Sequence, residues 1–203
     1  MTPVKNYSDL QQHLENLEAK GLLIRVKREI NKNTQLHPLV RWQFRGGIPE
    51  TGRKAFLFEN VTDGKDKHYA IPVAVAALAG NKEIYAAGLQ CTVEEIGQKW
   101  TRALANPVPP VLVDAGPVQE EVHLGQDLTN PGGGFDEFPV PISTPGFDNA
   151  PFTTCSHWIT KDPDTGIPNM GNYRGHIKAP NKIGMYANIG QAQDIIVHFG
   201  APG

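Results

Sequence analysis

The sequence predicts an α+β protein, and three observations favour that class. Two segments, Tyr7–Ala19 and Thr92–Ala105, carry apolar residues at helical spacing, whereas Ala55–Val61 and Thr153–Thr160 are rich in β-prone residues. Helices and strands do not alternate strictly, as they would in a parallel α/β sheet. With 203 residues, the chain can bury one good core or two small ones.

The first predicted helix spans Tyr7–Ala19. Ser8 with Gln11 three places on fits a capping box, and Gly21 is suited to close the carboxyl end. Its apolar stripe consists of Leu10, Leu14 and Leu17.

The other helix with a clear start is Thr92–Ala105, where Thr92 and Glu95 form a second capping-box pair and Pro107 follows the end. The remaining elements expected before residue 116 are a strand at Leu22–Val26, a helix at Leu36–Phe44, a strand at Ala55–Val61, an apolar segment buried on both faces at Pro72–Leu78 and a strand at Pro110–Ala115.

Composition excludes several function classes. The 19 basic and 21 acidic side chains give a formal net charge of −2, so there is no electrostatic reason to expect nucleic acid or an anionic membrane as partner. No apolar run approaches the roughly 20 residues of a membrane span, and the start does not resemble a signal peptide. We expect a cytoplasmic protein in which Cys91 and Cys155 are free thiols.

Residues 116–149 are rich in proline and glycine and poor in regular elements. A disordered linker is one interpretation, but apolar residues recur throughout the segment, including Val122, Leu128, Phe135 and Ile142. We interpret it as an ordered connection laid over the next domain.

A hairpin is predicted next. The strand Thr153–Thr160 leads into the turn Lys161–Gly166, and a return strand over Asn172–Lys178 places Asn172, Arg174 and His176 on one face. Another strand is expected at Ile183–Ile189, followed by the start of a helix at Gln191–Phe199.

The polar residues of this hairpin have a chemical use. The Asn169 amide oxygen suits a hard cation, the Arg174 guanidinium suits phosphate or carboxylate, and Gly171 lets a ligand approach the backbone closely. Together they could hold a phosphorylated cofactor through a cation. The alternative is a solvated hairpin with one stray arginine, in which Asn169 bonds its own backbone.

The run Thr160–Arg174, Thr-Lys-Asp-Pro-Asp-Thr-Gly-Ile-Pro-Asn-Met-Gly-Asn-Tyr-Arg, resembles the signature of the UbiD-type decarboxylases, which use prenylated FMN. That signature is a Thr-x-Asp-Pro turn followed by Asn-x-Gly-x-Tyr-Arg and a Lys-x-apolar strand. The start of the chain, Ser8–Leu10 through Gly21–Val26, is similar to the opening of the same proteins.

The resemblance implies a small amino-terminal α/β domain over residues 1–116. Residues 117–203 are then the connection and the first part of a split β-barrel that binds prenylated FMN. The implied reaction is non-oxidative decarboxylation, or reverse carboxylation, of an aromatic or unsaturated carboxylic acid.

The resemblance also implies residue roles. Asn169 is expected to ligate a divalent cation, Mn or Mg, with K as a further candidate cation, and Arg174 is expected to act as the catalytic residue that holds the substrate carboxylate. The expected cofactor-binding residues are Gly171, Asn172, Tyr173, Arg174, Tyr186, Ala187, Asn188, Gln191 and Ala192.

Two departures leave the enzyme interpretation open. Ala192 stands where the family often carries a ligating histidine, and the family's catalytic glutamates and oligomerisation domain fall beyond Gly203. We therefore expect a carboxy-lyase fragment or subunit that a missing carboxy-terminal half, or a homo- or hetero-oligomeric partner, completes. The alternative is a catalytically inert flavin-binding or assembly subunit on the same fold.

Overall fold

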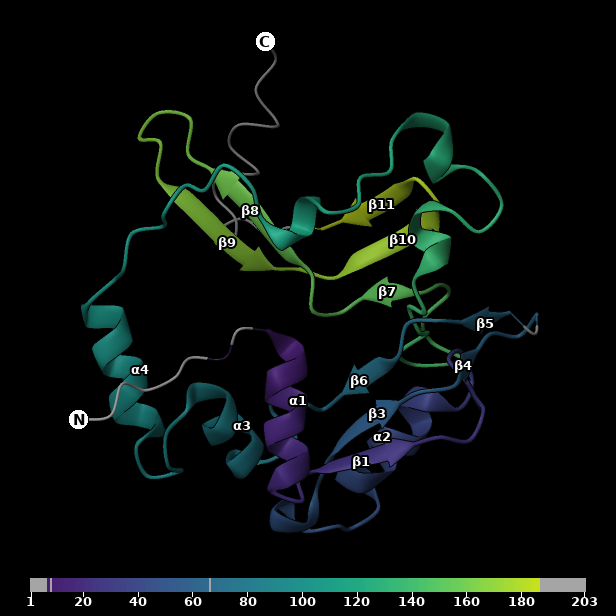
Figure 1. Ribbon diagram of the computed structural model, residues 1–203. Helices are drawn as coiled ribbons and strands as arrows, with labels where there is room; N and C mark the ends of the chain where they lie inside the picture. The colour runs from purple at the N-terminus through teal and green to yellow at the C-terminus, as the bar shows by residue number, and fades with distance from the viewer. Residues whose placement is uncertain (1–6, 8, 66, 187–203) are drawn as a thin grey trace. The chain divides into compact units, whose positions relative to one another are not determined.

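A computed structural model describes residues 7, 9–65 and 67–186 of the chain (Figure 1). The chain divides into two compact units, residues 1–122 and residues 123–203. We describe each unit by itself.

The first unit combines four helices with two small three-stranded sheets among the described residues. The helices are α1 (Leu10–Ala19), α2 (Leu36–Arg45), α3 (Lys82–Leu89) and α4 (Ile96–Ala105). The strands are β1 (Leu23–Val26), β2 (Ile30–Asn31), β3 (Ala55–Phe58), β4 (Val61–Thr62), β5 (His68–Tyr69) and β6 (Val73–Val75). The sheet orders are β1-β3-β6 and β2-β4-β5, and each sheet contains one parallel and one antiparallel pair.

Local signals explain where α1 begins and ends. Asp9, rather than Ser8, is the N-cap, and its side chain accepts a hydrogen bond of 2.8 Å from the Gln12 backbone N–H. Gly21 has φ +66°, the left-handed conformation in which a helix commonly ends, so the predicted role of Gly21 is confirmed.

Two clusters of buried side chains form the core of the first unit. One joins α1 and α3 to β3 and consists of Leu14, Leu17, Ala55, Leu57, Ala77, Ile84 and Ala87. The other packs α2 on the paired strands and consists of Ile30, Leu36, Val40, Phe58 and Val61. The alternation within β3 explains both clusters, because Leu57 and Phe58 face opposite sides of the strand.

Two expectations for this unit are wrong, and one helix was missed. The helix α3 was not predicted, although Asn81 caps it by accepting from the Ile84 backbone N–H at 2.8 Å. Residues 110–115 form no strand in the structure, because nothing among the described residues pairs with them. The strand β6 is half-buried, not buried on both faces.

Over residues 123–186, the second unit contains five strands in two small sheets. They are β7 (Phe152–Thr153), β8 (His157–Lys161), β9 (Pro168–Asn172), β10 (Gly175–Ala179) and β11 (Lys182–Met185). The sheet orders are β11-β10-β7 and β8-β9, all antiparallel. Over residues 123–186 these sheets do not close into a barrel, so the α+β class stands while the split barrel does not follow from the described strands alone.

The connection over residues 116–149 is ordered by short 3₁₀ turns at Pro117–Gln119, Gly125–Leu128 and Gly134–Glu137. Its last turn is tied to the β10–β11 turn, because the Phe135 N–H donates to the Pro180 carbonyl at 2.8 Å. A Cβ at Gly134 would lie 2.3 Å from that same carbonyl oxygen, so only glycine fits this close approach.

The predicted domain boundary at residues 116–117 stays a prediction. Within the described part of the chain, no helix has the length and apolar character needed to cross a membrane.

Candidate functional site

The hairpin β8–β9 carries three of the residues that the sequence singled out, Asn169, Gly171 and Asn172. Its register pairs Thr160 with Asn169 and Trp158 with Gly171. The turn between the strands is an Asx turn, because Asp162 Oδ1 accepts from the N–H groups of Asp164 and Thr165, each at 2.8 Å. This turn sets which side chains share a face of the hairpin.

The two faces of the hairpin differ in burial. On the outer face the cross-strand pair Ile159 and Met170 is 77% and 65% exposed. The inner face is half-buried and carries Trp158, Thr160, Asn169 and Gly171. Asn169 therefore lies on the inner face, beside Thr160.

The predicted return strand is wrong in its extent. A single strand over Asn172–Lys178 was expected, but β9 ends at Asn172 and β10 begins at Gly175. The chain changes partners between them, since β9 pairs with β8 whereas β10 pairs with β7 and β11. Arg174 consequently lies in the connection between strands, and Asn172 is on the exposed outer face of β9.

Tyr173 is fixed at this connection by its backbone. Its carbonyl oxygen accepts from Ser156 Oγ at 2.7 Å and from Trp158 Nε1 at 3.0 Å. A Cβ at Gly171 would lie 2.1 Å from Cε2 of Tyr173, so the tyrosine ring occupies the space over the glycine. The sequence analysis predicted that a ligand approaches the Gly171 backbone, but in the structure the Tyr173 side chain fills that space.

The Arg174 guanidinium is held by two groups from the preceding segment. Its Nη2 donates to Asp148 Oδ1 at 3.1 Å, and its Cζ lies 4.2 Å from the centroid of the Phe152 ring. Phe152 in turn stacks on His176, with ring centroids 4.6 Å apart. The guanidinium is thereby oriented while its side chain stays 51% exposed.

Asp148 is itself held in place. Its Oδ2 accepts from the Thr144 backbone N–H at 2.9 Å. Burial would raise the pKa of the Asp148 carboxyl, but the hydrogen bonds from Arg174 and Thr144 outweigh burial and lower the pKa below its ordinary value. Asp148 is therefore the ionised partner of Arg174 at neutral pH.

Two polar side chains on the inner face lack internal partners. Thr160 Oγ1 is buried and has no hydrogen-bond partner. Asn169 lies directly opposite Thr160 in the strand pair, and its side-chain amide also forms no hydrogen bond to any described residue. An amide and a hydroxyl side by side are oxygen groups suited to a hard cation and to phosphate, so the donor set fits the expected group.

The rest of the expected site is only partly described. Tyr186 is 78% exposed just after β11. Ala187, Asn188, Gln191 and Ala192 lie outside the described residues. Within the described part of the chain, no group of three or more His, Cys, Asp or Glu could hold a metal ion.

Sequence reasoning did not identify Thr160, Asp148 or Phe152 as site residues. Thr160 could have been found by pairing the two strands through the Asp162 turn, which places it opposite Asn169. Asp148 lies 26 residues before Arg174, and no local pattern marks that contact.

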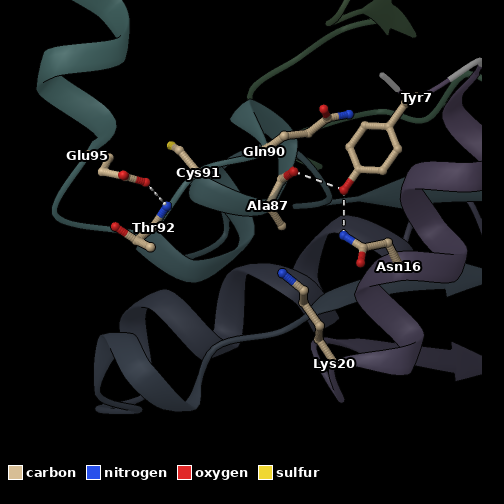
Figure 2. A pocket seen from close by; sticks show the side chains of 8 residues that line it. All are labelled: Tyr7, Asn16, Lys20, Ala87, Gln90, Cys91, Thr92 and Glu95. Carbon is tan, nitrogen blue, oxygen red and sulfur yellow. Dashed lines mark hydrogen bonds between the residues drawn. The ribbon is translucent and has the colours of Figure 1, made fainter. Parts of the chain in front are cut away.

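A separate pocket of about 390 Å³ lies in the first unit (Figure 2). Its lining residues are Tyr7, Asn16, Lys20, Ala87, Gln90, Cys91, Thr92 and Glu95. Several of their polar groups bond one another: the Tyr7 hydroxyl donates to the Ala87 carbonyl at 2.9 Å, and Glu95 Oε2 accepts from the Thr92 N–H at 2.9 Å (Figure 2). The Tyr7 contact joins the segment before α1 to α3, the Thr92 contact lies within the turn before α4, and neither indicates a particular ligand.

Comparison with known proteins defines the class. The 3-octaprenyl-4-hydroxybenzoate carboxy-lyase N-terminal domain matches residues 14–104, and the Rift-related domain of the same carboxy-lyase matches residues 111–199. The chain belongs to the UbiD family, of which it represents an amino-terminal portion.

Individual relatives agree with this assignment. A protein of Aquifex aeolicus, named only as uncharacterized, is 30% identical over 203 residues, which cover 90% of this chain and 39% of that protein. The evolved dimeric form of the UbiD-class enzyme HmfF from Pelotomaculum thermopropionicum, in complex with prFMN, has a TM-score of 0.69 at 29% identity and covers 90% of this chain. The closed form of vanillic acid decarboxylase from Sedimentibacter hydroxybenzoicus has a TM-score of 0.76 at 26% identity and covers 95% of this chain.

The chain is much shorter than these proteins. It spans 39% of the HmfF chain and 39% of the vanillic acid decarboxylase chain.

Proposed function

We propose that this chain supplies the flavin- and carboxylate-binding part of a prenylated-FMN-dependent enzyme. The enzyme decarboxylates an aromatic or unsaturated carboxylic acid, or carboxylates it in reverse. Family membership supports the proposal, as does the flavin bound in the two HmfF structures, one with prFMN and one with FMN. In this proposal the sheets of the second unit are the first part of a split β-barrel.

The observation that carries the proposal is the orientation of Arg174. Its guanidinium already binds one carboxylate, that of Asp148, through a single nitrogen at 3.1 Å. A guanidinium has five N–H donors in a planar fork, so donors remain for a second carboxylate. Contact with Phe152 fixes the plane of the group, which reduces the entropy lost when a substrate carboxylate binds.

The residues of β9 fit the cofactor's charged end. The side-chain amide oxygen of Asn169, on the inner face, would hold a Mn or Mg ion, which would supply positive charge for the flavin phosphate. Tyr173 and Gly171 would contact the flavin, which requires the tyrosine ring to rotate from its place over the glycine. Prenylated FMN, when bound, supplies the electron sink for breaking the carbon–carbon bond.

The proton that replaces carbon dioxide is assigned to a carboxylic acid beyond Gly203. In this proposal the described residues hold and orient the substrate, while a carboxy-terminal region or a second chain donates the proton.

The test is a fusion of this chain to the part of the Aquifex aeolicus relative that follows the matched region, loaded with prenylated FMN and Mn²⁺. We expect carbon dioxide release from at least one member of a panel of aromatic and unsaturated acids. Arg174→Ala should lower kcat/KM about 10- to 100-fold, because a charge-assisted contact to the carboxylate is lost. Arg102→Ala, in α4 of the first unit, is the matched control and should leave kcat/KM unchanged.

No release from a fusion that is folded and carries the flavin chromophore would contradict the proposal. Release that is insensitive to Arg174→Ala would contradict the role of Arg174 and leave the reaction class standing.

A further inference from the structure

The hydroxyl of Thr160 is a buried polar group without a use inside the protein. Its Oγ1 is inaccessible to solvent and has no hydrogen-bond partner. The Thr153 hydroxyl of the same unit is bonded: its Oγ1 contacts Ser156 Oγ at 2.8 Å and accepts from the Gly175 N–H at 3.0 Å. Thr160 therefore differs from Thr153, a threonine of the same unit whose hydroxyl has hydrogen-bond partners.

A buried hydroxyl without a partner is destabilising, because it loses hydrogen bonds to water and gains none. Valine has nearly the same shape and would fill the same space at no such cost. Such groups in native proteins call for an explanation, and one explanation is that the group binds a ligand. The strand pairing indicates which neighbouring residue would contact the same ligand.

Thr160 and Asn169 are directly opposite each other in the β8–β9 register, on the same half-buried face. Side chains at such paired positions have Cβ atoms about 4.5–5.5 Å apart, close enough to contact one ligand group together. Neither residue carries a charge, and the described structure assigns no hydrogen bond to the Asn169 amide either. The hydroxyl can donate to an anionic oxygen while the amide oxygen faces a cation.

We propose that Thr160 donates a hydrogen bond to a phosphate oxygen of the bound flavin nucleotide, next to the cation held by Asn169. This inference rests on the proposed function and adds a residue to its cofactor site. Phosphate is favoured over the substrate carboxylate because the oriented guanidinium of Arg174 already provides for a carboxylate. A hydrogen bond to an ionised oxygen is also stronger than one to a neutral acceptor.

The experiment compares FMN with riboflavin, which lacks the phosphate, on the fusion protein of the preceding subsection in the presence of Mn²⁺. Quenching of flavin fluorescence gives both affinities. Thr160→Val should weaken FMN binding about 10-fold or more, since a hydrogen bond to a charged group is removed, and should leave riboflavin binding unchanged. Thr160→Ser keeps the hydroxyl and should retain FMN binding within about threefold. Thr101→Val, whose hydroxyl bonds the Gly97 carbonyl within α4, is the matched control and should bind both flavins as the unaltered fusion protein does.

Ligand-free stability is the second measurement. Thr160→Val should raise the melting temperature by about 2–4 °C, because the unpaired hydroxyl is removed. Thr153→Val should lower the melting temperature, because its hydroxyl has partners. A threonine with a purely structural role would not give higher stability together with a selective loss of FMN binding.

Three results would overturn the inference. If Thr160→Val leaves FMN affinity unchanged, the hydroxyl does not contact phosphate and the proposed function survives. If Thr160→Val lowers the ligand-free melting temperature, the hydroxyl has a partner in the protein. If the unaltered fusion protein binds neither flavin, the flavin site itself fails, and the proposed function fails with it.

Discussion

The two units of this protein are stabilised in different ways. In the first unit, side chains from three helices and several strands are fully buried, and the buried hydrophobic residues of the described chain all lie between Leu14 and Ala87. In the second unit, over residues 123–186, only Pro139 and Gly175 are buried. That unit is held by strand pairing, by backbone contacts at turns and by polar contacts such as Arg174 with Asp148.

The unit with the packed core is therefore not the unit that carries the candidate site. A unit with a packed core loses free energy of unfolding whenever a core atom is removed. The second unit keeps polar side chains half-buried and apolar ones exposed, as Thr160 and Ile159 show on opposite faces of β8. Such an arrangement is typical of a surface that binds something else, and it places the candidate site in the less densely packed unit.

The largest expected effect tests this contrast directly. Phe58→Ala empties a fully buried position of the first unit and should cost about 3–5 kcal/mol of unfolding free energy. Ile159→Ala, on the outer face of the hairpin, should change it by less than about 0.5 kcal/mol. Urea unfolding, followed by amide hydrogen exchange in each unit, measures both effects. An Ile159→Ala cost as large as that of Phe58→Ala would show that the outer face is packed, and the contrast would fail.

The sequence predicted the first unit better because its signals are local. The helices α1, α2 and α4 overlap the predicted segments, since each has an apolar stripe and a nearby stop. The helix α3 was overlooked because its eight residues begin after an asparagine cap in a glycine-containing stretch that we assigned to no element. The strand expected at residues 110–115 had β-prone residues but no pairing partner in the described structure, and propensity alone does not make a strand.

In the second unit the hairpin and its turn were predicted, but the break between β9 and β10 was not. Alternation of side chains along a segment cannot show that the segment changes pairing partners, as this one does at Tyr173 and Arg174. The Asp148 contact to Arg174 came only from the three-dimensional arrangement, whereas pairing the strands through the Asp162 turn could have placed Thr160 opposite Asn169. The residues of the candidate site stay a prediction from the sequence, whereas several of their neighbours came from the structure.

An intermediate effect is expected at Gly171, where the two strands and Tyr173 meet. A Cβ there would lie 2.1 Å from the Tyr173 ring, so Gly171→Ala should cost about 1–3 kcal/mol unless the ring moves away. Gly97→Ala in α4 is the control, because no atom lies within 4 Å of its added Cβ and alanine favours helix.

Tyr173→Ala should relieve most of the cost of Gly171→Ala, and urea unfolding of the double-mutant cycle measures this coupling. Additive effects of the two substitutions would mean that the ring does not lie over the glycine. A full cost with strong coupling would show that the tyrosine side chain must rotate before any ligand can reach the Gly171 backbone.

The smallest effect concerns Asp148, whose pKa is lowered because hydrogen bonds from Arg174 and Thr144 outweigh burial. A carboxyl with a lowered folded-state pKa contributes stability above its unfolded pKa of about 4, and this contribution is lost as the pH falls through the folded value. Asp148→Asn should therefore cost roughly 0.5–1 kcal/mol at pH 7, a modest amount because Arg174 is half exposed, and almost nothing in strong acid. Unfolding free energies measured across this pH range check the prediction.

Arg174→Gln should remove the share of the pH dependence that comes from Arg174, and Asp148→Asn in that background should cost less than in the unaltered chain, because only the Thr144 hydrogen bond remains. A loss in Asp148→Asn that is equal at acid and neutral pH would mean that the carboxylate charge does not stabilise the unit. If the pair behaves as expected, the second unit maintains an oriented guanidinium at little gain in stability, as a group kept for binding requires.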